Sequence, residues 1–204
     1  MSKLKLNGER VALIELDEEI SGTIVVPQSR QKAYELGKIV AVGSGKVPSI
    51  EKPFDMYVKE GEIVLFSIPA QLRQSSTYVI DGARTCVVHQ NDVLGRLSSM
   101  KVSIDTFEIL GRWVLLTCFV DKKDSIIEIP DTAQLPVEDF KFRIEQVGSG
   151  ASELNMVKGD EVVVERTRCS TLEIDGSKYF YIDMSFVYGK VEPAVATEQT
   201  VDQE

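Results

Sequence analysis

Residues 37–45 read Gly-Lys-Ile-Val-Ala-Val-Gly-Ser-Gly, and their last four residues, Val-Gly-Ser-Gly, recur at residues 147–150. A short β-branched run that ends in closely spaced glycines is typical of a strand followed by a turn. The recurrence, roughly 100 residues later, indicates an internal repeat as long as a small domain and too long for a solenoid unit.

Three further motifs recur in the same order along the chain. They are residues 58–64 (Val-Lys-Glu-Gly-Glu-Ile-Val), which recur loosely at 156–162; residues 80–84 (Ile-Asp-Gly-Ala-Arg), which recur at 174–178; and residues 93–96 (Val-Leu-Gly-Arg), which recur at 187–190. Because four ordered matches are hard to obtain by chance, the sequence predicts two copies of one structural plan.

The local patterns are those of β-structure. Short β-branched runs at residues 39–42, 63–66 and 162–164 lie close to glycines. Residues 81–82 and 175–176 are both Asp-Gly, which suits a tight hairpin turn whose two central residues need positive φ. No stretch has a sustained helical period, so we predict an all-β fold made of two small irregular barrels.

The composition, with 43% hydrophobic and 27% charged residues over 204 positions, is that of a globular protein. No apolar run approaches the ~20 residues that cross a bilayer, and residues 1–8 lack an apolar signal core. We therefore expect a soluble protein of the cytoplasm, in a bacterial or phage-infected cell. If a targeting segment has been removed before this numbering begins, we expect an organelle stroma or matrix.

The net charge of −9 falls entirely on the second half of the chain. Residues 1–100 hold 12 Lys+Arg and 12 Asp+Glu, whereas residues 101–204 hold 11 and 20. Nucleic-acid binders need a basic excess to neutralise phosphates. Neither half has one, which disfavours that class of function.

The sequence shows no pattern typical of catalysis or of metal binding. Cys86, Cys118 and Cys169 are far apart and fit neither a disulfide framework nor a zinc site, so we expect small buried apolar residues. His89 is the only histidine, and no nucleophile is marked beside it. The Gly-Lys at residues 45–46 fails the phosphate-loop pattern at two positions. We predict no catalytic residue, no metal site and no cofactor.

The order of the motifs resembles that of the GroES-type ten-kilodalton co-chaperonin family, in a tandem, double-length form. The likeness is good over residues 10–96 and looser over 112–190. It is closest at residues 37–45, and residues 58–66 also match well. It implies two GroES-like β-barrels joined by a short linker. The implied function is that of a co-chaperonin, not an enzyme, that caps a chaperonin ring and assists ATP-dependent protein folding by the chaperonin.

The resemblance also implies partners and domain bounds. The partners are a chaperonin ring with GroEL-type apical domains, further copies of this chain in a ring, and an unfolded client protein, without nucleic acid or membrane. In the family, the last strand of one subunit pairs with the first strand of its neighbour. The implied bounds are residues 1–97 for domain 1, with a mobile loop at about 17–35 and a small roof segment at about 46–54; 98–106 for the linker; 107–191 for a divergent domain 2 without the roof hairpin; and 192–204 for an acidic disordered tail.

The chaperonin-binding residues that the resemblance implies lie in the mobile loop, where a glycine precedes three apolar residues. They are Gly22, Thr23, Ile24, Val25, Val26 and Pro27. Such a loop would become ordered as its apolar side chains enter a groove of the apical domain. From the residues alone, an ordinary strand at 24–26 is the alternative.

The matching place in the second copy holds a weaker candidate loop with Ile126, Ile127 and Ile129. Glu128 interrupts this apolar triplet, and burying an unpaired carboxylate is costly. We therefore expect the first copy to make most of the chaperonin contact.

An alternative function is that of a GroES-fold structural or assembly protein, for example one encoded by a virus, without chaperonin binding. The divergent second copy and the absence of the family's usual aromatic residue near residues 67–70 favour it. Proteolytic exposure of residues 22–32 would favour the co-chaperonin, and protection would favour the alternative. A barrel that binds single-stranded nucleic acid is disfavoured by the charge.

Overall fold

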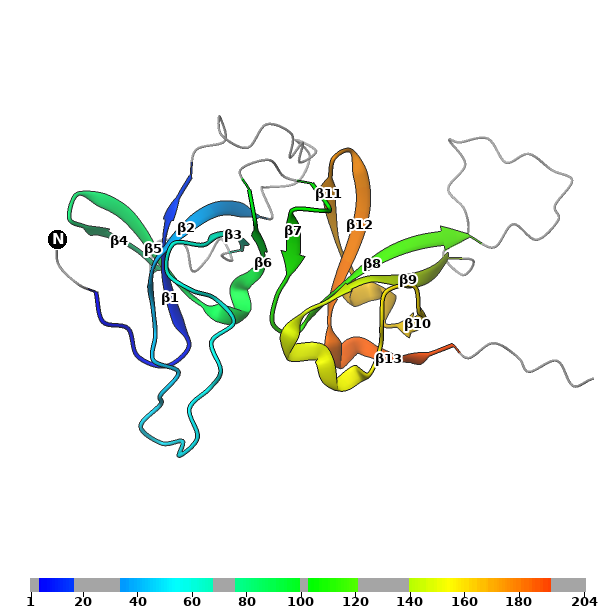
Figure 1. The fold of residues 1–204 in the computed structure, drawn as a ribbon, viewed down its shortest axis with the longest axis horizontal. Coiled ribbons are helices and arrows are strands. Elements are labelled where there is room, and N and C mark those ends of the chain that lie inside the picture. Colours follow the sequence, from blue (N-terminus) through cyan, green and yellow to red (C-terminus); the bar gives the residue numbers. More distant parts are fainter. Residues whose placement is uncertain (1–3, 17–33, 68–75, 100–102, 121–139, 192–204) are drawn as a thin grey trace, which may run out of the picture.

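The computed structural model describes residues 4–16, 34–67, 76–99, 103–120 and 140–191. Its strands form two antiparallel sheets that lie one after the other along the long axis of the molecule (Figure 1). The first sheet has the order β4-β5-β1-β2-β3-β6-β7, and the second has the order β11-β12-β8-β9-β10-β13. The predicted fold class, all-β with two tandem barrels, is confirmed.

The strands of the first sheet are β1 (Arg10–Glu15), β2 (Glu35–Val42), β3 (Ile63–Phe66), β4 (Thr77–Ile80), β5 (Ala83–His89), β6 (Val93–Leu97) and β7 (Phe107–Ile109). Those of the second are β8 (Trp113–Val120), β9 (Phe140–Val147), β10 (Glu161–Val164), β11 (Ser170–Ile174), β12 (Ser177–Asp183) and β13 (Val187–Lys190). Short 3-10 helices lie at Gln90–Asp92, Ser149–Leu154, Arg166–Arg168 and Met184–Phe186. Among the described residues, no helix is long and apolar enough to span a membrane.

Both hairpins predicted from Asp-Gly are confirmed. Asp81 and Gly82 have φ values of 49° and 81° between β4 and β5, and Asp175 and Gly176 have 51° and 73° between β11 and β12. Positive φ at both central residues is the geometry of a tight hairpin turn. The two copies therefore place the same turn between corresponding strands.

The first glycine of the recurring Val-Gly-Ser-Gly motif follows β2 in the first copy and β9 in the second. In each copy it lies close to the backbone of the segment that precedes the first strand. A Cβ atom on Gly43 would lie 2.2 Å from the carbonyl oxygen of Gly8, and one on Gly148 would lie 2.5 Å from that of Gly111. The second glycine of each motif donates its backbone N–H to the same carbonyl, over 3.0 Å in the first copy and 2.8 Å in the second. Only glycine fits this approach, which explains the spacing in both copies.

The copies differ between their second and third strands. In the first sheet, the segment between β2 and β3 extends well away from the strands (Figure 1). Within it, the backbone N–H of Phe54 donates to the carbonyl of Gly45 over 3.0 Å. In the second, the interval is shorter and contains the Ser149–Leu154 3-10 helix. The predicted domain bounds stay a prediction. Strand β7, which the prediction assigns to domain 2, is the last strand of the first sheet.

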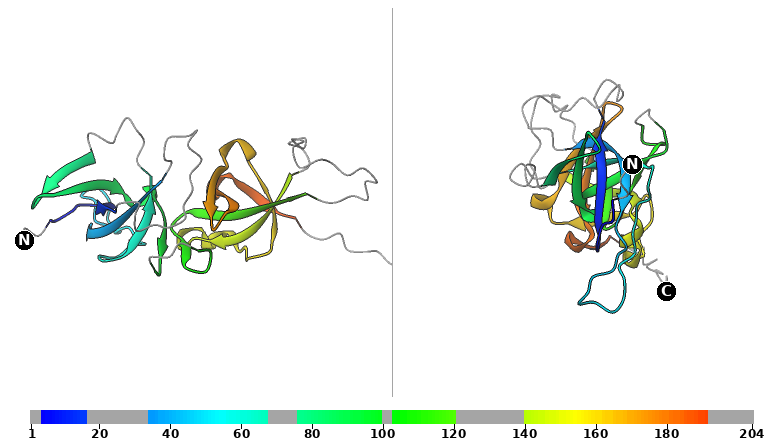
Figure 2. Two further views of the ribbon diagram at one scale, coloured as in Figure 1. Left: turned by 90° about the horizontal axis from the view of Figure 1, so that it is seen from above. Right: turned by 90° about the vertical axis from the view of Figure 1, so that its left-hand side faces the viewer.

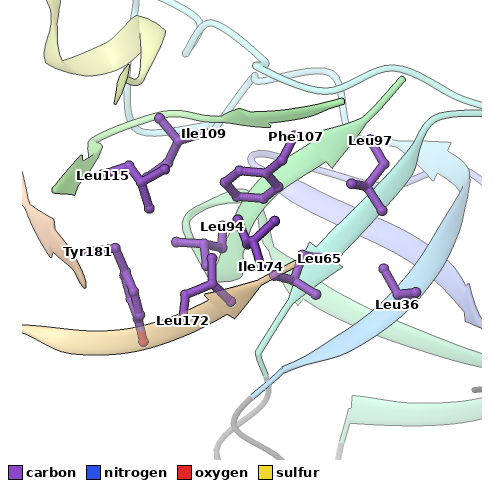
Figure 3. Packing of buried hydrophobic residues seen from close by; sticks show 10 residues of the cluster. All are labelled: Leu36, Leu65, Leu94, Leu97, Phe107, Ile109, Leu115, Leu172, Ile174 and Tyr181. Carbon is purple, nitrogen blue, oxygen red and sulfur yellow. The ribbon is translucent and has the colours of Figure 1, made fainter. Parts of the chain in front are cut away.

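Each sheet has its own apolar core, and a third cluster lies between them. The first core includes Leu13, Ile39 and Phe66, and the second includes Leu116, Ile144 and Ile182. The cluster between the sheets, called here the interdomain cluster, draws buried residues from both (Figure 3). Its members are Leu36, Leu65, Leu94, Leu97, Phe107, Ile109, Leu115, Leu172, Ile174 and Tyr181.

Candidate functional site

The predicted chaperonin-binding residues at 22–27 lie outside the described residues, and the structure shows the two strands that flank them. Strands β1 and β2 pair antiparallel, with Glu15 opposite Gly37. The backbone N–H of Leu16 donates to the carbonyl of Leu36 over 2.9 Å. The candidate loop therefore leaves one strand and returns to its hydrogen-bonded neighbour, so its two ends are held side by side.

Both ends of this loop pack against the interdomain cluster. Leu16, before the loop, and Tyr34, after it, are half-buried there. The Tyr34 ring meets the Tyr181 ring edge-on, with centroids 5.4 Å apart, and Tyr181 meets Trp113 in the same way at 5.5 Å. Burial raises the pKa of the Tyr181 hydroxyl. The base of the loop is thus anchored on the second sheet as well as on the first.

A thiol–carboxylate contact lies next to the first end of the loop. The Cys86 Sγ donates to Glu15 Oε1 over 3.0 Å, and the Arg84 Nε lies 3.9 Å from the other carboxylate oxygen. Burial, and then the hydrogen bond to Glu15, raise the pKa of the Cys86 thiol. Because the thiolate is the reactive form, this cysteine is suited to packing rather than to nucleophilic chemistry.

The predicted second-loop residues Ile126, Ile127 and Ile129 also lie outside the described residues. Their flanking strands, β8 and β9, pair antiparallel to the last described pair on each side of the gap. Charged groups surround this base: the Arg143 guanidinium lies 4.4 Å from the centre of the Phe119 ring, and Lys141 pairs with Glu161 at 3.3 Å. Both candidate loops fall between corresponding strands, β1 and β2 in the first copy and β8 and β9 in the second. Only the first pair of strands has described residues next to the loop that pack in the interdomain cluster.

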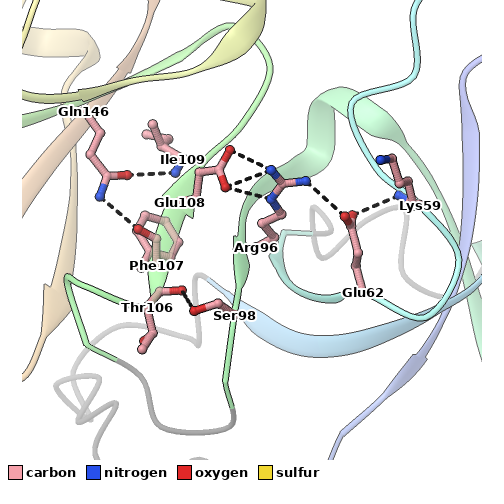
Figure 4. Close-up of polar contacts among 9 residues, drawn as sticks. All are labelled: Lys59, Glu62, Arg96, Ser98, Thr106, Phe107, Glu108, Ile109 and Gln146. Carbon is pink, nitrogen blue, oxygen red and sulfur yellow. Dashed lines mark hydrogen bonds and ion pairs between the residues drawn. The ribbon is translucent and has the colours of Figure 1, made fainter.

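A polar network holds the two copies together where β6 pairs with β7, as the family resemblance implies (Figure 4). Arg96 donates to Glu108 over 2.8 Å and to Glu62 over 3.0 Å, and these bonds, that to Glu108 first, raise the pKa of the guanidinium. The Gln146 side chain accepts from the backbone of Ile109 and donates to that of Phe107, over 2.9 and 2.8 Å.

Sequence reasoning did not find this network. The feature of the sequence that points to it is Glu108 between the apolar residues Phe107 and Ile109. This pattern does not identify Arg96 or Gln146 as the partner residues.

His89 and the three cysteines are the other residues considered for catalysis or metal binding. His89 ends β5 and caps the Gln90–Asp92 3-10 helix, and its Nδ1 accepts from the backbone of Asn91 over 3.2 Å. All three cysteines are free thiols. Within the described ranges, no group of three or more His, Cys, Asp or Glu side chains is placed to hold a metal ion.

Known proteins match the first copy of the repeat. The family model of the chaperonin 10 Kd subunit matches residues 3–97. The co-chaperonin GroES of Exiguobacterium sp. is 35% identical over 94 residues, which are 45% of this chain and 95% of that protein. The co-chaperonins GroES of Desulfotalea psychrophila and Thermus thermophilus are 35% and 32% identical, over 79% and 91% of their lengths and 39% and 46% of this chain.

These matches fall on the first copy, from the segment before β1 to the end of β6, and include the strands on both sides of the first candidate loop. The relatives are covered almost completely by less than half of this chain. The second sheet, with the same hairpin turn and the same glycine motif, is an additional copy of the plan. The chain belongs to the GroES family of co-chaperonins, the chaperonin 10 Kd subunit family, and carries its fold in tandem.

Proposed function

We propose that this protein is a co-chaperonin that caps a chaperonin ring through mobile-loop contacts and assists the ATP-dependent folding that the chaperonin performs. Its partners are the apical domains of a GroEL-type ring, further copies of this chain and an unfolded client, in the cytoplasm. It has no catalytic role of its own. The observation that carries the proposal is the family match over residues 3–97, which includes the candidate loop and both of its flanking strands.

The proposed contact is made by residues 22–27, with Ile24, Val25 and Val26 entering the apical groove. Burying three such side chains gains roughly 5–8 kcal/mol. Ordering each loop residue costs roughly 1–2 kcal/mol of backbone entropy. A single loop therefore binds weakly, and capping requires several loops on one oligomer, because later contacts then become intramolecular.

The first loop is the better candidate for the main contact. Its base rests on buried apolar residues, so the two ends of the loop are already fixed before it binds. The second candidate loop carries Glu128 within its apolar triplet, and Arg143 and the Lys141–Glu161 ion pair lie near its base. A structural protein without chaperonin binding is the alternative function, and the GroES relatives favour the co-chaperonin.

The test is size-exclusion co-elution with a GroEL-type chaperonin, with and without adenine nucleotide. We expect the wild-type chain to co-elute in the presence of nucleotide and Val25→Asp to lose co-elution. The matched control is Val157→Asp, which places the same change at an exposed valine far from the loop in sequence. Co-elution of Val25→Asp at the wild-type level would contradict the proposed loop. A folded wild-type chain that never co-elutes would contradict the proposed function.

A further inference from the structure

The second copy presents two aromatic side chains at the base of the first candidate loop. Tyr181, on β12, is only 7% exposed, and the ring of Trp113, at the start of β8, meets it edge-on with centroids 5.5 Å apart. The Tyr181 ring also meets that of Tyr34, the first described residue after the loop, at 5.4 Å. Tyr181 and Trp113 are called here the aromatic brace.

The brace covers the hydrogen bond that closes the base of the loop. The backbone N–H of Leu16, the last described residue before the loop, donates to the carbonyl of Leu36 over 2.9 Å. Leu36 and Tyr181 are buried members of the interdomain cluster, and Leu16 and Tyr34 pack against it. Both ends of the loop therefore lie under residues that the second copy supplies.

The first copy has no equivalent of the brace among its described residues. Strand β5 pairs with β1 in the register in which β12 pairs with β8, which makes Val87 the equivalent of Tyr181 and Arg10 that of Trp113. Figure 2 (left view) shows the β11–β12 hairpin beside the first sheet and the β4–β5 hairpin towards the outer end of the molecule. The aromatic pair thus occurs in the copy whose hairpin faces a loop base.

The base of the second candidate loop has a different kind of support. Phe119 is the equivalent of Leu16, because Cys118 pairs with Phe142 as Glu15 pairs with Gly37. The group over the Phe119 ring is the Arg143 guanidinium, 4.4 Å from the ring centre, which comes from the same copy. Within the described residues, support by aromatic rings of the other copy is therefore specific to the first loop.

We propose that the second copy acts as a support for the first loop, and that Tyr181 is the positioning residue of this support. It acts through Tyr34, which it holds at the end of the loop. A loop whose ends are fixed loses less conformational entropy when it binds, so the brace raises the affinity of each loop, and several loops on one oligomer multiply the gain. This inference deepens the proposed function and rests on it for the chaperonin measurement, but not for the first test.

The first test needs no chaperonin. Hydrogen exchange of the Leu16 backbone N–H, followed by NMR spectroscopy, reports the opening of the loop base. Tyr181→Leu removes one aromatic pair on each side of the ring and should speed this exchange roughly three- to tenfold. Tyr34→Leu, which removes the contact from the half-buried side, should also speed it. Tyr181→Phe keeps the ring and should exchange at the wild-type rate.

Phe180→Leu is the matched control, because it removes a ring from the neighbouring position of β12, whose side chain lies on the opposite face of the strand. The Phe180 ring meets that of Phe142 in the core of the second copy, with centroids 5.4 Å apart. This variant should lower the free energy of unfolding in urea without speeding the exchange of Leu16. A general loss of stability is thereby separated from a loss of the support.

The second test is titration of a GroEL-type chaperonin in the presence of adenine nucleotide. Tyr181→Leu should bind at least tenfold more weakly than Phe180→Leu, because a small loss at each loop is multiplied over several loops. Equal Leu16 exchange in Tyr181→Leu, Tyr34→Leu and Phe180→Leu would overturn the support. Faster exchange with unchanged affinity would overturn its role in binding. A wild-type chain that never binds would overturn the proposed function, and the exchange measurement would then decide the support by itself.

Discussion

The interdomain cluster makes one sharp prediction, because the same hairpin residue occurs in both copies in different surroundings. Ile174 at the end of β11 is 2% exposed and packs in the interdomain cluster. Its equivalent, Ile80 at the end of β4, is half-buried and belongs to no buried cluster. Replacing each by alanine removes the same atoms. The difference between the two losses of unfolding free energy therefore measures how much packing against the first copy stabilises the second.

The expected magnitudes follow from burial. Isoleucine-to-alanine removes about three methylene equivalents, worth ~0.8 kcal/mol each when fully buried. The cavity left in a packed cluster adds to this, so Ile174→Ala should lower the free energy of unfolding by about 3–4 kcal/mol. Ile80→Ala should cost about 1 kcal/mol, because its side chain keeps part of its contact with water and leaves no closed cavity.

Urea unfolding followed by tryptophan fluorescence suits this test. Trp113 is the only tryptophan, packs against the interdomain cluster, and donates its Nε1–H to the carbonyl of Asn91 over 3.2 Å. Its emission therefore reports on this boundary. The measurement is made at low protein concentration, where contacts between chains do not contribute. Equal losses for Ile174→Ala and Ile80→Ala would refute the reasoning, since the cluster would then add nothing to stability.

Three further predictions test the repeat, a thiol and the charge pairing. Gly148→Ala should cost about 3 kcal/mol of unfolding free energy, because the new Cβ would lie 2.5 Å from a backbone carbonyl oxygen, whereas Gly189→Ala, with no atom within 4 Å, should be tolerated; chemical denaturation of both checks this. Burial raises the pKa of the Cys169 thiol to about 11, so the stability it provides is complete below its usual pKa of 9.0 and is lost as pH rises towards 11; the advantage of wild type over Cys169→Ala should therefore shrink between pH 8.5 and 11 in urea titrations. Glu108→Lys places a lysine opposite Arg96 and should lower the free energy of unfolding by about 1 kcal/mol, an effect that added salt reduces.

Local features of the fold follow directly from the sequence. The two Asp-Gly pairs specify the hairpins, because so few residue pairs accept positive φ at both positions. The hairpin signal acts within a few residues, so it does not depend on what the rest of the chain does. The glycines of the repeated motif predict a strand followed by a turn, but their close approach to the carbonyls of Gly8 and Gly111 joins positions far apart in the chain, and the motif alone does not predict it.

The division of apolar residues between core and surface could not be predicted in this way. Leu172 and Tyr78 are equivalent positions on the same hairpin, yet the first is buried and the second is 52% exposed. Periodicity shows which face of a strand is apolar, but it does not show what covers that face. Here the cover is a neighbouring copy, which the second hairpin has within the chain and the first hairpin does not.

The sequence predicts the candidate site from its apolar motif, but it does not predict which residues pack at the base of the loop. The apolar triplet at residues 24–26 stands out in the sequence, but nothing near it indicates that Tyr34 would meet Tyr181 from the other copy. This contact joins positions far apart in the chain, and it exists only because β7 places the second sheet against the first. The base of the loop therefore depends on the tandem arrangement, whereas the loop sequence does not.

The difference between the two loop bases bears on which loop makes the main contact of the proposed function. Leu36, beside the first base, belongs to the interdomain cluster, and its equivalent in the second copy is Lys141, which pairs with Glu161. Burying a leucine contributes roughly 1.5–3 kcal/mol, whereas an exposed ion pair contributes about 0–1 kcal/mol. The strand that ends the first loop is therefore held more firmly than its counterpart in the second copy, and this difference favours the first loop as the main contact.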